Sequence, residues 1–158
     1  MRKQFSDLLY KLMQENEDVY LLLGDLGYGW FDQHKKDFPN RVINCGASEQ
    51  AMVGMAVGMA YEGKLPFVYS ITNFLLYRPF EFIRNYIDHE KTKVVLVGSG
   101  RDKDYEHDGI SHWSEDAEEV MGLFRNITAY FPQDKKDVEG LLKDIVEGDG
   151  PAFISLKR

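Results

Sequence analysis

The sequence has one cysteine, fewer basic than acidic residues, and no long apolar run. Cys45 is the only cysteine, which excludes a disulfide bond within the chain and fits the reducing cytoplasm. The N-terminal residues lack the apolar stretch of a signal peptide, and no apolar run reaches the length of a membrane-spanning helix. We therefore expect a cytoplasmic protein that has no membrane partner.

Basic residues are outnumbered by acidic ones. The chain has 19 lysine and arginine residues against 26 aspartate and glutamate residues, which gives a formal net charge of -7 and a pI near 5.1. The basic residues are scattered and form no stripe interleaved with aromatic residues. This balance argues against nucleic acid, or an anionic membrane surface, as a partner.

The hydrophobic pattern alternates between short apolar runs, which predict buried strands, and amphipathic stretches, which predict helices. The alternation predicts one α/β domain over residues 1–158, with a doubly wound, mostly parallel sheet of about six strands and helices on both faces. The predicted strands are Val19–Leu23, Val42–Asn44, Pro66–Ile71, Val94–Val97, Ile127–Tyr130 and Ala152–Leu156. The predicted helices are Phe5–Met13, one that begins near Glu49, Pro79–His89, Ser114–Leu123 and Lys135–Val146.

Polar clusters follow several of these strands. In doubly wound sheets, ligands bind beyond the carboxyl ends of the strands. The last cluster lies in the long loop Gly98–Trp113, and loops of that length in compact domains are usually functional or disordered. We therefore expect the functional site among four clusters: Gly24-Asp25, Gly46–Glu49, Thr72–Phe74 and Asp108–His112.

The segment Asn44–Met52 is the most informative part of the chain. It leads from a short apolar strand through Gly46 into a helix that has Glu49 in its first turn and almost only small or apolar residues behind it. A carboxyl group at the mouth of such a helix is expected to be partly buried, and burial favours its protonated form. Such a group can hold or share a proton with a heteroaromatic ring. The alternative is that Glu49 only complements the helix dipole.

Four blocks in register resemble the pyrimidine-binding domain of the transketolase family of thiamine diphosphate enzymes. The resemblance covers essentially the whole chain and implies the thiamine diphosphate-binding fold. More narrowly, the chain resembles the C-terminal-section subunit of a split transketolase that lacks the family's third domain. The blocks are Gly24–Leu26, Arg41–Met52, Phe74–Arg84 and Asp108–His112, and Gly150–Ile154 resembles the segment that closes the domain.

The resemblance implies a role for particular residues. Glu49 would be catalytic: it would bind a ring nitrogen of the cofactor's aminopyrimidine and so promote loss of the thiazolium proton. His112 would be the second catalytic residue and would contact the donor substrate together with Asp108. We also expect Arg78 among the substrate-binding residues. The implied cofactor-binding residues are Glu49, Asp25, Phe74, Tyr77 and Phe80.

Several of these residues have plainer interpretations. The spacing of Phe74, Tyr77 and Phe80 suits stacking on a flat heteroaromatic ring, but it is also the spacing of ordinary helix core. Arg78 and Arg84 would face a phosphate or a neighbouring subunit, or would be surface charges. These alternatives stay open at the level of the sequence.

The family holds Mg²⁺ and the diphosphate in a second domain, whose signature is Gly-Asp-Gly followed further along by Asn. Only eight residues follow Gly148-Asp149-Gly150, so this copy is not the metal motif. A metal site at His107, Asp108 and His112 is the less favoured interpretation of the loop, because its spacing is not that of a helix face and no cysteine or second carboxylate block accompanies it. We therefore expect no metal site in this chain.

The missing half of the active site implies a partner. We expect a separately encoded diphosphate-binding (N-terminal-section) transketolase subunit that supplies most of the Mg²⁺ ligands, in an α2β2 assembly. Gly54 and Gly58 are four residues apart on the helix behind Glu49, and small residues at that spacing let another helix approach closely. The alternative is tight packing of this helix on its own sheet.

The implied reaction is transfer of a two-carbon ketol unit between sugar or sugar phosphate substrates, in an enzyme active only with its partner chain. The segment Ile110–Trp113 departs from the small-Thr-His-Gln pattern of transketolases, which leaves the donor open. One alternative is a 2-keto acid that is decarboxylated before acyl transfer, and another is a non-catalytic scaffold subunit of the same fold. A flavodoxin-like nucleotide-binding domain fits less well, because no glycine-rich phosphate loop follows the first strand.

Overall fold

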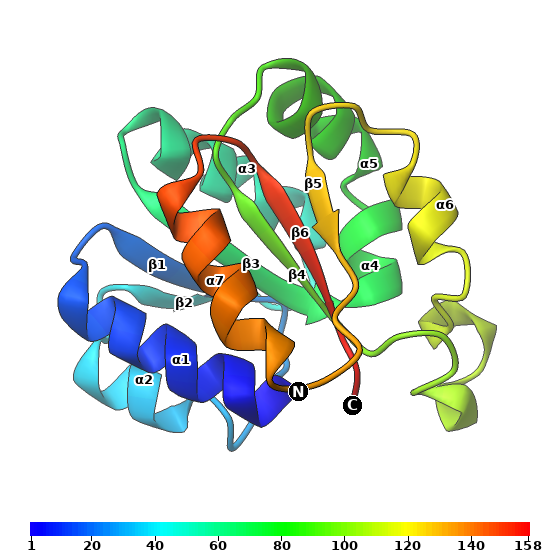
Figure 1. The fold of residues 1–158 in the computed structure, drawn as a ribbon, viewed down its shortest axis with the longest axis horizontal. Coiled ribbons are helices and arrows are strands. Elements are labelled where there is room, and N and C mark those ends of the chain that lie inside the picture. The colour runs from blue at the N-terminus through cyan, green and yellow to red at the C-terminus, as the bar shows by residue number, and fades with distance from the viewer.

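The computed structural model describes residues 1–158 and contains one six-stranded sheet (Figure 1). All neighbouring strands are parallel, and their order across the sheet is β2-β1-β3-β4-β6-β5. The predicted α/β class is confirmed, whereas the assignment of residues 1–158 to a single domain stays a prediction. The strands are β1 (Val19–Leu23), β2 (Val42–Asn44), β3 (Leu65–Ile71), β4 (Val95–Ser99), β5 (Thr128–Tyr130) and β6 (Ala152–Leu156).

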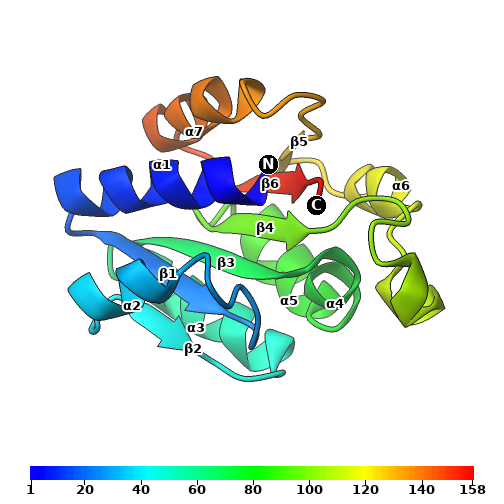
Figure 2. The same ribbon diagram turned by 90° about the horizontal axis from the view of Figure 1, so that it is seen from below.

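Helices cover both faces of the sheet (Figure 2). On one face, α1 (Arg2–Glu15) and α7 (Asp137–Glu147) bury their apolar residues in a core cluster with residues of β1, β3 and β4. On the other face, α3 (Glu49–Tyr61), α4 (Thr72–Tyr77) and α6 (Ala117–Met121) form a second cluster. Because the central strands are covered on both sides, their sequences read as nearly continuous apolar runs.

None of these helices has the length and apolar composition that crossing a membrane requires.

The winding of the chain reverses between β1 and β3. The chain leaves β1 toward β2, and α3 then carries it back so that β3 pairs on the opposite side of β1. At the carboxyl end of this pair, the Gly24 N–H donates to the Tyr69 carbonyl oxygen at 3.0 Å. Such a reversal is where open α/β sheets bind ligands, and here the first residue of α3 lies beside it.

Several helical segments differ from the ranges predicted from the sequence, and α4 lies where no helix is predicted. The apolar pattern does not predict α2 (Asp32–Asp37), because all six of its residues are polar. The helix predicted over residues 79–89 is a short α5 (Phe80–Phe82) followed by a π-helix, η1 (Ile83–His89). The long loop after β4 contains two 3₁₀ turns, η2 (Glu106–Asp108) and η3 (Ile110–His112), so it is more ordered than its polar sequence suggests.

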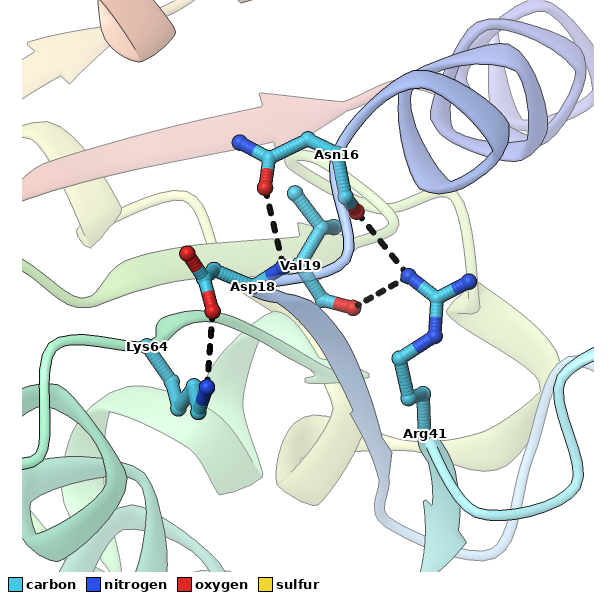
Figure 3. Close-up of polar contacts among 5 residues, drawn as sticks. All are labelled: Asn16, Asp18, Val19, Arg41 and Lys64. Carbon is cyan, nitrogen blue, oxygen red and sulfur yellow. Dashed lines mark hydrogen bonds and ion pairs between the residues drawn. The ribbon is translucent and has the colours of Figure 1, made fainter.

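Arg41 ties the end of α1 to the amino edge of the sheet (Figure 3). Its guanidinium donates to the carbonyl oxygens of Met13 at 2.8 Å and Asn16 at 2.9 Å, which the end of the helix leaves without intrahelical partners. Beside it, Lys64 forms an ion pair with Asp18 at 2.7 Å. These contacts lie at the edge of the sheet opposite the predicted site. They therefore stabilise the fold and do not bind a ligand.

Candidate active site

A pocket of about 750 Å³ opens at the start of α3. It lies at the carboxyl edge of the sheet, where the polar clusters were expected. Glu49 and Arg78 are the only charged residues that line it, so the ionic character of the pocket depends on this pair. The other lining residues are Ala47, Ser48, Gln50, Ala51, Gly54 and Phe82.

Glu49 is the buried acid of the pocket, with 1% of its surface exposed. The chain reaches it from β2 through Gly46, whose φ of +68° favours glycine, and α3 begins at Glu49 itself. One carboxylate oxygen accepts a hydrogen bond from the Ser70 hydroxyl at 2.9 Å, and the other pairs with Arg78 at 2.6 Å. The burial expected from the sequence is therefore present, and both oxygens of Glu49 have a partner.

Gly24 makes the close packing around Glu49 possible. A Cβ atom at this position would lie 2.7 Å from the Ser70 hydroxyl oxygen and 3.3 Å from a carboxylate oxygen of Glu49. The end of β1 can thus pass beside these two groups only without a side chain. The requirement explains why a glycine stands directly before Asp25.

Arg78 has two contacts in the pocket. Besides its ion pair with Glu49, its guanidinium lies over the ring of Phe74 at 3.8 Å from the ring centroid. A planar cation over an aromatic face is held by the ring quadrupole as well as by its counter-ion. Arg78 keeps 44% of its side chain exposed although it reaches a carboxylate that is almost fully buried.

His112 joins this group through Phe74. The two rings meet edge-on with centroids 4.8 Å apart, and the Ser111 hydroxyl lies 2.9 Å from the Nδ1 atom of His112. Asn73 donates to the carbonyl oxygen of Ser111 at 3.1 Å, which anchors η3 to α4. The structure therefore brings together four of the predicted site residues in one chain of contacts: Glu49, Arg78, Phe74 and His112.

Tyr77 and Phe80 lie away from Glu49, and neither lines the pocket around it. The Tyr77 hydroxyl donates to Asp116 at 2.5 Å, and burial together with this carboxylate raises the pKa of Tyr77 to about 12. Phe80 packs against Phe124 with ring centroids 5.3 Å apart. Their predicted role in binding the cofactor stays a prediction, and both side chains contact the region around α6.

Asp25 lies at the carboxyl end of β1 in a left-handed conformation with φ of +54°. Its carboxylate accepts hydrogen bonds from Tyr28 at 2.7 Å and from the Asn44 amide at 3.2 Å, and these bonds hold its pKa below the usual range. Non-glycine residues in this region cluster at functional sites. The geometry therefore keeps Asp25 among the candidate site residues.

Asp108 stands apart from the other site residues. It is exposed in η2, and its side chain makes no hydrogen bond or ion pair. No group of three histidine, cysteine or acidic residues in residues 1–158 is placed to hold a metal ion. His107, Asp108 and His112 accordingly do not form the cluster that the metal interpretation requires, and substrate binding by Asp108 stays a prediction.

Two polar residues of the site carry no clear signal in the sequence. Ser70 lies inside the apolar run of β3, where a single serine reads as a tolerated small residue. Asn44 appears as the end of β2, although its side-chain oxygen accepts the N–H groups of Asp25 and Gly46. Their only signal in the sequence is that each is a polar residue near the carboxyl end of a strand predicted to be buried.

Comparison with known families places this geometry in context. The family model "Transketolase, pyrimidine binding domain" matches residues 1–158. The chain therefore belongs to the family of transketolase pyrimidine-binding domains. The family resemblance drawn from the four sequence blocks is confirmed.

Three relatives of the chain are described as sections or subunits of transketolases. A protein of Methanocaldococcus jannaschii, assigned as a transketolase C-terminal section, is 31% identical over 159 aligned residues, which cover 100% of this chain and 50% of that protein. The 6-deoxy-6-sulfo-D-fructose transketolase subunit SqwH of Clostridium sp. (strain MSTE9) is 29% identical, and the match covers 100% of this chain and 49% of that subunit. A subunit of the apulose-4-phosphate transketolase of Phocaeicola vulgatus is 26% identical over 99% of this chain and 51% of that subunit. The chain thus spans about half the length of these relatives.

Solved structures agree with the sequence relatives. A split-gene transketolase, described as an inactive β4 tetramer, superposes with a TM-score of 0.86 at 30% identity over 99% of this chain and 51% of that chain. Transketolase from Campylobacter jejuni has a TM-score of 0.89 at 21% identity, over 99% of this chain and 25% of that chain. The second match shows the shared fold alone.

Proposed function

We propose that this chain is the pyrimidine-binding part of a transketolase-like enzyme that uses thiamine diphosphate to transfer two-carbon ketol units between sugars or sugar phosphates. The observation that carries the proposal is Glu49. It is a nearly fully buried carboxyl group at the first residue of a helix, beside the switch point of the sheet and one contact away from an aromatic face. That combination suits a carboxyl group that hydrogen-bonds a ring nitrogen of a flat heteroaromatic ligand.

The residues of the pocket fit the pyrimidine half of the cofactor. The pocket offers an acid for a ring nitrogen and a volume large enough for a small ring, and the aromatic face of Phe74 lies against Arg78, which lines the pocket. When bound, thiamine diphosphate supplies the thiazolium carbon that carries the two-carbon unit. Glu49 holds the proton shared with the ring, and the Ser70 hydroxyl fixes the orientation of the Glu49 carboxyl group.

His112 and its neighbours are proposed to bind the sugar. The edge-on contact with Phe74 and the hydroxyl of Ser111 hold the His112 ring close to the pyrimidine position. From there the imidazole can donate to, or accept a proton from, a substrate hydroxyl or carbonyl oxygen. Asp108 in the same loop carries a free carboxylate that can accept hydrogen bonds from sugar hydroxyl groups.

The names of the relatives support a sugar as the substrate. One relative acts on 6-deoxy-6-sulfo-D-fructose and another on apulose-4-phosphate, according to their descriptions. Both are transketolase subunits, and neither name points to 2-keto acid decarboxylation or to a scaffold role. The two alternatives drawn from the sequence are therefore not favoured.

The diphosphate and Mg²⁺ are assigned to a partner chain. Residues 1–158 contain no cluster of three metal-ligating side chains. The outer face of α3 exposes small and apolar residues, among them Ala51, Gly58 and Met55, the last with 44% of its surface exposed. We place a diphosphate-binding chain against this face, in a cytoplasmic heteromer with two copies of each chain.

The proposal is tested by calorimetry with thiamine diphosphate and Mg²⁺, on this chain mixed with a neighbouring gene product that carries the Gly-Asp-Gly and Asn motif. We expect the mixture to bind the cofactor and to transfer ketol units, and Glu49→Gln to lower the turnover rate at least about 100-fold, because Gln cannot hold the shared proton. Glu62→Gln, an exposed change at the other end of α3, is the matched control and should leave the rate unchanged. A stable complex that binds no cofactor would reject the proposal.

A further inference from the structure

Both oxygens of the buried carboxylate are already in use in this chain. Ser70 donates to one oxygen of Glu49, and the Arg78 guanidinium pairs with the other at 2.6 Å. The proposed function requires a pyrimidine nitrogen to bind this same carboxyl group. Each oxygen has a second lone pair, but the carboxyl group is 1% exposed, and the guanidinium fills the space between it and the Phe74 ring. A flat ligand that enters this space must therefore displace Arg78.

Arg78 resembles the proposed ligand in shape and in bonding. Its guanidinium is flat, donates to the Glu49 carboxylate and lies 3.8 Å over the ring centroid of Phe74. An aminopyrimidine bound between the same two side chains would make the same pair of contacts: a polar bond to the acid and a stack on the aromatic face. The guanidinium and the ring compete for one volume.

We propose that Arg78 is an exchangeable counter-ion that fills the pyrimidine position of the free chain and swings out when the cofactor binds. The proposal rests on the proposed function, because the pyrimidine position is defined there. Arg78 is suited to this exchange by its place in the fold. It caps the C-terminal end of α4, and 44% of its side chain is exposed, so rotation about its own bonds can carry the guanidinium into water without unpacking the core.

Two consequences follow for the free chain. The guanidinium stabilises a carboxylate that would otherwise be charged and buried without a counter-ion, which destabilises a fold. It also weakens ligand binding, since the apparent Kd is the intrinsic Kd divided by the fraction of molecules with an open site. If the partner chain favours the open position of Arg78, binding of the cofactor becomes coupled to assembly of the two chains.

The first test measures binding of the free aminopyrimidine half of thiamine to this chain by NMR titration. We expect Arg78→Met to bind it roughly tenfold tighter than the unmodified chain, because Met keeps the length of the side chain but leaves the carboxyl group free. Arg84→Met is the matched control: Arg84 is exposed and bonds only Asn85, so this change should leave the Kd unaltered. Equal or weaker binding by Arg78→Met would overturn the proposal.

The second test uses thermal unfolding and needs no ligand. We expect Arg78→Met to lower the Tm by roughly 3–6 °C in the presence of Glu49, and by much less in a Glu49→Gln background, where no buried charge is left unpaired. An equal fall in both backgrounds would show that Arg78 and Glu49 are not coupled and would also overturn the proposal.

The two proposals fail in different ways. If the aminopyrimidine binds the unmodified chain and Arg78→Met equally well, and Glu49→Gln abolishes binding, the exchange is wrong and the proposed function stands. If no variant binds the aminopyrimidine and the assembled complex binds no thiamine diphosphate, the proposed function fails and the exchange fails with it. Tighter binding by Arg78→Met together with a background-dependent Tm supports both.

Discussion

The hydrogen bond from Ser70 fixes the orientation of the Glu49 carboxyl group. The hydroxyl donates to one carboxylate oxygen and so leaves the second oxygen as the place where a cation or a ligand binds. Gly24 lets the neighbouring backbone pass close to these groups, because a side chain there would collide with Ser70. At the scale of single residues, the site is an acid with one fixed and one exchangeable partner.

His34 is a buried titratable residue that the site does not use. Its Nε2 atom lies 3.1 Å from the carbonyl oxygen of Ser6, its Nδ1 atom has no partner, and the rings of Tyr10 and Phe31 meet it edge-on. Burial lowers the pKa of His34 below its ordinary value, and the nearby carboxylates of Asp7 and Asp37 only partly oppose this effect. The folded chain therefore keeps the neutral imidazole.

This burial predicts a loss of stability in mild acid. The unfolded chain binds a proton at His34 near its ordinary pKa of about 6.5, whereas the folded chain binds it only at lower pH. The contribution is thus complete above about pH 7 and is lost as the pH falls below the unfolded pKa toward the folded one. We expect the free energy of unfolding, measured in urea, to decrease from pH 7 to pH 5.

A variant separates His34 from the other histidines. His34→Gln keeps a donor for the Ser6 carbonyl oxygen but does not titrate, so its stability should fall less over the same pH range. His89→Gln, at an exposed position, is the control and should follow the unmodified chain. Identical pH curves for His34→Gln and the unmodified chain would contradict the assignment.

Pro79 explains why the aromatic stripe divides. Phe74, Tyr77 and Phe80 would share one face of a continuous helix, but α4 ends at Tyr77 and α5 begins only at Phe80. Proline lacks the N–H that would continue the helix from α4. At the scale of elements, the break separates Phe80, which packs on Phe124, from the α4 residues Phe74 and Tyr77, which contact Arg78 and Asp116.

A mutation at the amino edge of the sheet is expected to lower stability without changing ligand binding at the site. Arg41→Met removes the hydrogen bonds to the Met13 and Asn16 carbonyl oxygens at the end of α1. We expect the free energy of unfolding to fall by about 1.5–3 kcal/mol, the range for hydrogen bonds to a charged group. Chemical denaturation measures the loss, and binding of the aminopyrimidine should be unchanged.

Arg125→Met is the control for this prediction, because Arg125 is exposed and makes no side-chain hydrogen bond. Its stability should stay within about 0.5 kcal/mol of the unmodified chain. If both variants lost the same stability, the contacts of Arg41 at the end of α1 would have no special role.

At the scale of the whole molecule, the outer face of α3 is the expected contact with the partner chain. Met55→Asp places a charge on this face, where Met55 is 44% exposed. We expect the change to leave the Tm of the free chain within a few degrees and to abolish assembly with the diphosphate-binding chain, because an unpaired charge would be buried in the interface. Size-exclusion chromatography with light scattering measures assembly.

The control for assembly is Leu123→Asp, since Leu123 is 65% exposed and lines a separate pocket with Phe80 and Arg84. This variant should assemble normally. Loss of assembly by Leu123→Asp, with retention by Met55→Asp, would move the interface from α3 to the other pocket.

Short, uninterrupted apolar runs made most of the fold predictable. Val19–Leu23 and Ala152–Leu156 are buried on both faces, and their ends match the predicted strands. By contrast, α2 is too polar to show a periodic pattern, and the π-helical turns of η1 differ from an ordinary helix only in their hydrogen bonds. Such features depend on tertiary packing rather than on local hydrophobicity.

The sequence by itself determined the α/β class, the family and the position of Glu49 at the start of its helix, because hydrophobic period, glycine turns and motif order are local properties of the chain. Only the tertiary structure decided what Glu49 meets. Ser70, Arg78 and Phe74 lie 21 or more residues away along the chain, and they reach the carboxyl group or its counter-ion only because parallel strands bring their carboxyl ends to one edge. The competition between Arg78 and a ligand is therefore a property of the fold and not of any motif.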